Sequence, residues 1–234
     1  MNIKKFTGKI NNVVDLSKTA KEISISLSEP IDFIPGSFVN VFIDVNGEKV
    51  RRAYSISSSS MENKNITLTI RLSPTGLLTP LFWNKDMIGE NIEMMGPLGL
   101  NTVDKMKQNK IYLFAFGVGA GVVKSIADHF FNQKNIKSLI ILTGSKSEDE
   151  ILYKDYFNGL YSSDSKKVFI QHVVSKAQEG SNFQQGYIQD YINEFDFNNS
   201  DVYVCGQEKA CNDLVEKIKS TNPNDCNYFI EGFH

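Results

Sequence analysis

An arginine, a tyrosine and a serine lie close together at Arg52, Tyr54 and Ser55, with Ala53 among them. A guanidinium group pairs with phosphate oxygens through two parallel hydrogen bonds, and an aromatic ring packs against a flat organic ring. The tract therefore has the chemistry to bind a nucleotide-containing cofactor. A solvated strand charge beside a core tyrosine would show the same residues, so both interpretations stay open at this point.

Two glycine-containing tracts could bind phosphate groups. The first runs from 73 to 80, before a predicted helix over 77–83, and the second joins an apolar run at 111–116 to a helical pattern over 122–133. N–H groups at a helix N-terminus attract anions, and glycine allows close approach to the backbone. An ordinary capped helix is the alternative for the first tract. The candidate binding positions are Gly76, Leu77, Leu78, Thr79, Gly117 and Gly119.

Reactive side chains also follow two predicted strands near the end of the sequence. Cys205 and Gly206 end an apolar run, and Glu231 and Phe233 follow another. Ligands of doubly wound sheets bind at the carboxyl ends of the strands, which makes Cys205 and Gly206 candidates for a site. The alternatives are inert packing for the cysteine and a frayed tail for the last residues.

Residues 1–102 carry the pattern of a β-domain. Apolar residues alternate with polar ones at 23–27, 39–43 and 66–72, and turn residues separate these short runs. Alternation of period two predicts half-buried antiparallel strands, and many such strands in sequence favour a closed barrel. We therefore predict an antiparallel, Greek-key β-barrel domain over residues 1–102.

Residues 103–234 change to a repeated pattern of apolar strand, loop and helix. Buried-type strands are predicted at 111–116, 139–143, 168–174, 202–205 and 228–230. Strands that alternate with helices indicate a parallel sheet covered on both faces. The prediction for this domain is an α/β doubly wound fold with a five-stranded sheet.

Composition excludes several classes of protein. A hydrophobic fraction of 41% and a charged fraction of 22% are ordinary for a folded protein, and a net charge of -2 argues against a nucleic-acid partner. The longest apolar stretch is shorter than the ~18 residues of a membrane span, and no secretory signal is recognisable. Three cysteines match no zinc or iron–sulfur spacing, so we expect no metal and a reducing, cytoplasmic location.

The order of these tracts resembles the ferredoxin-NADP reductase family, which has an FAD-binding barrel followed by an NAD(P)-binding domain. The tract from Arg52 to Ser55 is similar to the family's Arg-x-Tyr-Ser motif. The resemblance implies that Arg52 pairs with the FAD pyrophosphate, that Tyr54 packs on the isoalloxazine and that Ser55 hydrogen-bonds near flavin N5. It also implies that the turn from Gly76 to Thr79 receives the pyrophosphate.

The second domain shows the same resemblance, with departures. It implies that Gly117 and Gly119 bind the nicotinamide nucleotide, that the Cys205 thiol beside Gly206 faces nicotinamide C4, and that Phe233 or His234 covers the flavin. The tracts that resemble the family's adenosine 2′-phosphate site contribute Ser175, Lys176, Tyr187 and Gln189. Phe116 replaces a glycine, Val122 a proline and Lys176 an arginine of the family pattern.

The resemblance implies hydride transfer between NAD(P)H and bound FAD, with Ser55, Cys205 and Glu231 as catalytic residues. We expect single electrons to pass to a separate carrier such as ferredoxin or flavodoxin. One alternative is an NAD(P)H:free-flavin reductase, which the phosphate-type turn at 75–79 disfavours. The other is an electron-transfer subunit of a larger complex, whose known examples carry a cysteine cluster. The sequence leaves open the acceptor, the choice of NADPH or NADH, and the oligomeric state.

Overall fold

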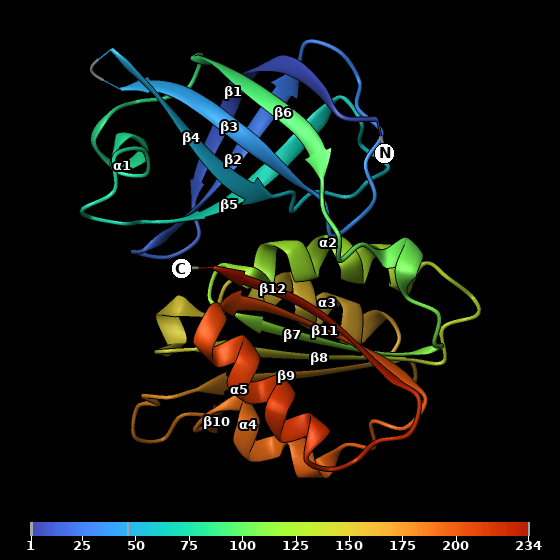
Figure 1. The fold of residues 1–234 in the computed structure, drawn as a ribbon. Coiled ribbons are helices and arrows are strands. Elements are labelled where there is room, and N and C mark those ends of the chain that lie inside the picture. The colour runs from blue at the N-terminus through green and yellow to red at the C-terminus, as the bar shows by residue number, and fades with distance from the viewer. Residues whose placement is uncertain (1, 46, 234) are drawn as a thin grey trace.

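The computed structural model describes residues 2–45 and 47–233. The first six strands form an antiparallel sheet in the order β4-β3-β6-β1-β2-β5, with α1 after β5 (Figure 1). The edge strands meet where Ile56 bridges to Leu68, which confirms the predicted barrel. The bounds are β1 (Lys4–Asp15), β2 (Ala20–Leu27), β3 (Phe38–Val45), β4 (Glu48–Ser55), β5 (Asn65–Arg71), α1 (Leu81–Asn84) and β6 (Asn91–Leu98).

The barrel interior is filled by the apolar residues that alternate along its strands. Ile23 and Ile25 of β2 and Ile66 of β5 are each at most 1% exposed. Full burial of such a side chain contributes ~1.5–3 kcal/mol to stability. The packed barrel therefore fixes the end of β4, where Ser55 lies.

The second sheet is parallel throughout, in the order β10-β9-β8-β7-β11-β12. It contains the five predicted strands and a sixth, β10, which is only two polar residues long and leaves no apolar pattern. The strand bounds are β7 (Lys110–Phe116), β8 (Ser138–Ser145), β9 (Val168–Val174), β10 (Gln184–Gln185), β11 (Ser200–Gln207) and β12 (Cys226–Phe233).

Helices cover both faces of this sheet, over two separate apolar cores (Figure 1). None of the helices within residues 2–45 and 47–233 is long and apolar enough to cross a membrane. The bounds are η1 (Val103–Lys105), α2 (Gly119–Phe131), η2 (Glu148–Glu150), α3 (Lys154–Ser163), α4 (Ile188–Tyr191), η3 (Ile192–Glu194) and α5 (Glu208–Lys219).

Two predicted helices begin elsewhere than expected. The helix predicted over 77–83 is wrong in extent, because α1 begins only at Leu81. The Thr79 hydroxyl accepts the Ser73 amide at 2.9 Å and holds the preceding residues in a loop. Conversely, α2 begins at Gly119 rather than 122, because its first turn packs closely on the Cys205 backbone and is stabilised there.

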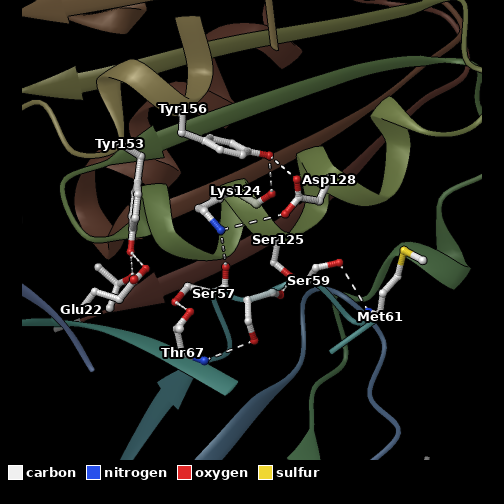
Figure 2. Close-up of polar contacts among 12 residues, drawn as sticks. Glu22, Ser57, Ser59, Met61, Thr67, Lys124, Ser125, Asp128, Tyr153 and Tyr156 are labelled. Atoms are coloured by element: carbon white, nitrogen blue, oxygen red, sulfur yellow. Dashed lines mark hydrogen bonds and ion pairs between the residues drawn. The ribbon is translucent and has the colours of Figure 1, made fainter. Parts of the chain in front are cut away.

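Helix α2 lies between the parallel sheet and the barrel, and its polar residues reach the barrel loop at 57–61 (Figures 1 and 2). Ser125 Oγ donates to the Ser58 carbonyl at 2.6 Å, and Lys124 Nζ donates to the Ser57 carbonyl at 3.5 Å. The buried serine contact is screened little by water, so it fixes the two domains beside each other at α2.

A tyrosine provides a second polar connection between the domains. The Tyr153 hydroxyl donates to Glu22 at 2.7 Å and accepts from the Thr69 hydroxyl at 2.6 Å (Figure 2). Tyr153 comes from the loop before α3, whereas both partners belong to the barrel. Burial raises the pKa of Tyr153 far above its ordinary value, so the hydroxyl stays protonated and remains a donor.

Candidate active site

The end of β4 meets the last strand of the parallel sheet at one carboxyl group. Ser55 Oγ donates to Glu231 Oε1, and the Tyr203 hydroxyl donates to Glu231 Oε2 at 2.6 Å. Ser55 belongs to the barrel, and the other two residues belong to the parallel sheet. Two of the three predicted catalytic residues are therefore in direct contact across the two domains.

Burial dominates the electrostatics of this cluster. It raises the pKa of the Glu231 carboxyl, and the two hydrogen bonds from Ser55 and Tyr203 oppose the rise because they favour the ionised form. Burial and the nearby Glu231 charge also raise the pKa of the Tyr203 hydroxyl well above its usual value. The phenol thus stays a donor, and the carboxyl is the group of this cluster that can exchange a proton nearest to neutral pH.

Cys205, the third predicted catalytic residue, is packed inside the domain core. Its side chain is 0% exposed, and burial raises the pKa of its thiol well above the ordinary value. Its backbone pairs with Glu231 of β12, and among the described contacts the donors to the carboxyl oxygens are Ser55 and Tyr203 rather than the thiol. A protonated, buried thiol is not a nucleophile, and any part it takes must come from its shape and position.

Gly206 follows Cys205 and is required by close packing. Its φ is +146°, and a Cβ atom there would lie 2.5 Å from the Phe116 Cβ atom. This contact explains how the chain accommodates Phe116 where the family pattern has a glycine. Phe116, the last residue of β7, packs against the Gly206 backbone.

The residues predicted to contact FAD, Arg52 to Tyr54, directly precede Ser55 at the end of β4. Arg52 and Ala53 are exposed, and Tyr54 is half-buried against the barrel core. Burial raises the pKa of Tyr54 to about 12, opposed by the charge of Arg52. Among the described residues, the Arg52 guanidinium bonds only to the Arg51 carbonyl, so its remaining donors face solvent and fit a phosphate group.

The turn at 76–79 presents backbone rather than a helix end. Gly76 N–H donates to the Ser73 carbonyl at 2.9 Å, whereas the amides of residues 77–79 donate to no described residue. Leu77 is 54% exposed, but Leu78 is buried, and the Thr79 hydroxyl is already bonded within the loop. Free amides of this kind fit a phosphate group, with Gly76 and Leu77 more accessible than the other two positions.

The second glycine turn leads directly into a long helix. Gly117 has a left-handed φ of +54°, and a Cβ atom there would meet nothing within 4 Å. At Gly119 a Cβ atom would lie 2.2 Å from the Cys205 carbonyl oxygen. One glycine therefore leaves open backbone at the N-terminus of α2, and the other lets the helix pack onto β11. This arrangement fits a nucleotide phosphate at the open turn.

The four residues predicted around an adenosine phosphate divide into two groups. The Gly186 N–H donates to the Val174 carbonyl at 3.0 Å. Because Ser175 follows Val174 and Tyr187 follows Gly186, these two residues lie near each other. Lys176, which follows Ser175, is exposed, as is Tyr187. The Gln189 side chain is directed toward α5 instead: its Nε2 donates to the Ala210 carbonyl at 3.4 Å, while its buried Oε1 has no partner among the described residues.

Phe233 ends β12 and pairs with Gln207, where it packs partly against the domain core. His234, the other predicted flavin cover, lies outside the described residues. Sequence reasoning missed Tyr203, whose hydroxyl contacts the Glu231 carboxyl. The available signal was a tyrosine inside an apolar strand, two residues before Cys205, since a buried phenol needs a polar partner.

Two family models match the chain in succession. Residues 7–102 match the oxidoreductase FAD-binding domain, and residues 113–217 match the oxidoreductase NAD-binding domain. Fold and site thus define a two-domain oxidoreductase that binds FAD and a nicotinamide nucleotide. The chain belongs to the ferredoxin-NADP reductase family, as the sequence resemblance predicted.

Curated relatives support the same family. The electron transfer subunit of dihydroorotate dehydrogenase B from Fusobacterium nucleatum is 31% identical over 191 residues, covering 79% of this chain and 68% of that protein. The electron transfer component of toluate 1,2-dioxygenase from Pseudomonas putida is 25% identical over 229 residues, covering 96% of this chain. This chain spans 66% of the length of that component and 56% of a glycine betaine monooxygenase reductase subunit from Pseudomonas aeruginosa.

Solved structures show the same fold. A cytochrome P450 reductase from Amycolatopsis superposes with a TM-score of 0.88 at 19% identity, covering 99% of this chain and 71% of that chain. A ferredoxin NADP+ reductase from Neisseria gonorrhoeae with bound FAD and NADP gives 0.81 at 15% identity, covering 100% of both chains. At these identities the likeness establishes the arrangement of barrel and parallel sheet.

Proposed function

We propose that this chain is an FAD-dependent NAD(P)H reductase that passes single electrons to a separate carrier. The observation that carries the proposal is the junction at Glu231, where one carboxyl accepts hydrogen bonds from Ser55 and Tyr203. Ser55 lies within the FAD-binding match and Tyr203 within the NAD-binding match. A titratable carboxyl therefore lies where the two cofactor domains meet, and this supports a role for it in proton exchange during a reaction between their ligands.

Each domain contributes a phosphate site and a contact for a flat ring. Arg52 and the free amides after Gly76 would hold the FAD pyrophosphate, with Tyr54 and Ser55 beside the ring system. FAD bound by these residues would supply the chemistry of hydride acceptance from NAD(P)H and of one-electron release. The residues proposed to hold the nicotinamide nucleotide are Gly117, Gly119, Ser175, Lys176, Tyr187, Gly206 and Phe233.

The catalytic roles divide between proton exchange and positioning. Glu231 would exchange a proton through the Ser55 hydroxyl, because that hydroxyl lies on the barrel side of the carboxyl. Cys205 would set the depth of the nicotinamide pocket through its packed side chain. We propose that the side chain of Gln189, which contacts α5, turns toward the bound nucleotide. This rotation would give its unpaired Oε1 a partner.

We further propose an electron carrier of ferredoxin or flavodoxin type as the partner, and no nucleic acid. Relatives are named as electron transfer components of dioxygenases and as a reductase component of phenol 2-monooxygenase. We place the domain boundary at 102/103, where β6 and its following turn have ended. The three free cysteines are consistent with a cytoplasmic location.

A second candidate is an electron-transfer subunit that works inside a larger complex. The identity of 31% to the dihydroorotate dehydrogenase B electron transfer subunit favours it. In that case the acceptor would be a cluster or flavin of a bound partner rather than a diffusible carrier. Reduction of added ferredoxin or flavodoxin by the purified chain would favour the first candidate, and strict dependence on a co-purified subunit would favour the second.

An absorbance spectrum of the purified full chain tests the common part of both candidates. We expect a yellow protein whose released flavin is FAD, and we expect anaerobic NADPH or NADH to bleach its visible band. A colourless protein that binds added FAD no better than riboflavin would instead support the free-flavin reductase. A yellow protein that neither nucleotide reduces would remove the nicotinamide half of the proposal.

A further inference from the structure

The Glu231 carboxyl takes one hydrogen bond from each domain. Ser55 at the end of β4 donates to one oxygen, and Tyr203 on β11 donates to the other at 2.6 Å. Because each oxygen has its own donor, two anchors set the orientation of the carboxyl plane. Tyr203 is the anchor on the same sheet as Glu231, whereas Ser55 lies across the domain junction.

Tyr203 is held rigidly. Its side chain is 0% exposed, and its backbone pairs with Leu113 of β7 and Phe229 of β12. A buried hydroxyl without a partner costs free energy, and Glu231 is its acceptor within the described part of the chain. The phenol can therefore neither turn to solvent nor give up its bond without a penalty.

Glu231 has weaker support from its own strand. Within the described residues, β12 is an edge strand of the sheet and pairs with β11 on one side. On the barrel side the strand is contacted through Asn101, whose Nδ2 donates to the Ile230 carbonyl at 2.5 Å. Backbone contacts of this kind fix the strand but do not set the side-chain torsions of Glu231, so the orientation of its buried carboxyl depends on its two hydrogen-bond donors.

We propose that Tyr203 is a positioning residue that keeps the Glu231 carboxyl turned toward Ser55 across the domain junction. The inference rests on the proposed function and deepens it, since it names the group that aims the proton-exchanging carboxyl. Without the Tyr203 hydroxyl, one carboxyl oxygen loses its donor in a buried setting. The carboxyl is then held by the Ser55 hydrogen bond alone, which does not fix the orientation of the carboxyl plane.

The other groups around Glu231 do not replace this donor. Cys205 lies beside it on β11, and Cys211 of α5 places its sulfur 4.0 Å from the Glu231 carbonyl oxygen. Glu208 of α5 packs near Gly232. The two thiols are buried with raised pKa values, and Glu208 adds a further acidic side chain. None of the three donates to the carboxyl oxygens among the contacts of the described residues.

Tyr203→Phe tests the proposal, because it removes only the hydroxyl. Tyr112→Phe is the matched control: Tyr112 is also buried in the parallel sheet, and its hydroxyl donates at 2.7 Å to the Asp196 carbonyl, away from Glu231. The readout is the pH titration of the Glu231 carboxyl by carbon-13 NMR of labelled protein. Glu231→Gln identifies the resonance, and no activity is needed.

We expect Tyr203→Phe to raise the apparent pKa of Glu231 by ~1 unit, because the lost donor favoured the ionised form. Ser55→Ala should shift the titration in the same direction, and Tyr112→Phe should leave it in place. In stopped-flow experiments we follow the pH dependence of the rate at which NAD(P)H reduces bound FAD. The apparent pKa that is lost from this profile in Glu231→Gln should rise by the same amount in Tyr203→Phe.

The two levels of failure are distinguishable. An unchanged Glu231 titration in Tyr203→Phe, or an equal shift in Tyr112→Phe, would overturn the role of Tyr203 whether or not the protein is active. If the Glu231 titration shifts in Tyr203→Phe but NAD(P)H cannot reduce the wild-type protein, the role of Tyr203 stands and the proposed function is overturned instead.

Discussion

The glycine turns at Gly76 and Gly117 share a sequence signal and differ in construction. Gly117 is left-handed and joins β7 to the 13-residue helix α2, so a helix N-terminus stands behind it. Gly76 has no left-handed backbone, and the helix after it begins at Leu81 and spans 4 residues. A glycine before an apolar run thus predicts a turn, but not the length of helix behind the turn.

If both turns bind phosphate as proposed, the difference assigns the binding free energy of the two sites to different groups. At Gly117 the aligned peptides of α2 favour an anion. At Gly76 so short a helix contributes little, and the proposed binding of phosphate would depend on free amides and on the charge of Arg52. We therefore expect the turn at Gly117, the nucleotide turn, to be sensitive to substitutions that change packing. We expect the turn at Gly76, the flavin turn, to be sensitive to substitutions that change charge.

The largest expected effect is on packing at the nucleotide turn. Gly119→Ala places a Cβ atom 2.2 Å from the Cys205 carbonyl oxygen, and the three nearest atoms all belong to the Cys205–Gly206 backbone. We expect a loss of ~3 kcal/mol, since overpacking of a tight contact typically costs 1–3 kcal/mol or somewhat more. For a chain of this size the loss lowers Tm by roughly 6–12 °C, measured by thermal unfolding.

Gly159→Ala is the matched control, because Gly159 lies inside α3 and a Cβ atom there meets nothing within 4 Å. Replacement of glycine by alanine in a helix should raise stability by about 0.5–1 kcal/mol. Equal Tm values for the wild type and Gly119→Ala would show that close packing does not build the nucleotide turn.

The next effect concerns charge at the flavin turn. Arg52→Ala should weaken FAD binding by ~1.5–3 kcal/mol, the value of a hydrogen bond to a charged group. That loss corresponds to a roughly ten- to hundredfold higher Kd, measured by titration of the apoprotein with FAD. Arg51→Ala removes an equally exposed neighbouring charge and should change Kd little. Similar losses in both variants would mean that Arg52 acts only through net charge.

The sequence predicted the fold well where patterns are local. β9 has the bounds that its apolar run indicated, Val168–Val174, and the alternation at 23–27 lies within β2. Period and apolar content determine such strands through burial. β10 was missed because its two residues are polar and extended only through pairing with β9. Tertiary contacts, rather than local preference, decide an element of that length.

The site was less predictable because its contacts are non-local. The residue types at Ser55 and Glu231 were foreseen from a motif, yet 176 positions separate the two partners of their hydrogen bond. Tyr203 reaches Glu231 through the pairing of β11 with β12, which local sequence does not encode. The Gly76 turn also contains a contact that the motif does not indicate. The Thr79 hydroxyl, which the motif assigns to phosphate, accepts a hydrogen bond from the Ser73 amide within the loop.

The smallest expected effect tests whether the nucleotide half reads the adenosine as well as the phosphates at Gly117. Lys176 is exposed after β9, and its side chain bonds to no described residue. Its ammonium is a point charge without the fork of arginine, so it should discriminate modestly. We expect Lys176→Ala to raise the KM for NADPH by the equivalent of ~1–2 kcal/mol, with kcat nearly unchanged and NADH kinetics unaffected. Lys166→Ala, which removes an exposed charge just before the opposite end of the same strand, should leave both nucleotides unchanged. Steady-state assays with both nucleotides decide the point, and an equal loss with NADPH and NADH would show that Lys176 does not bind the 2′-phosphate.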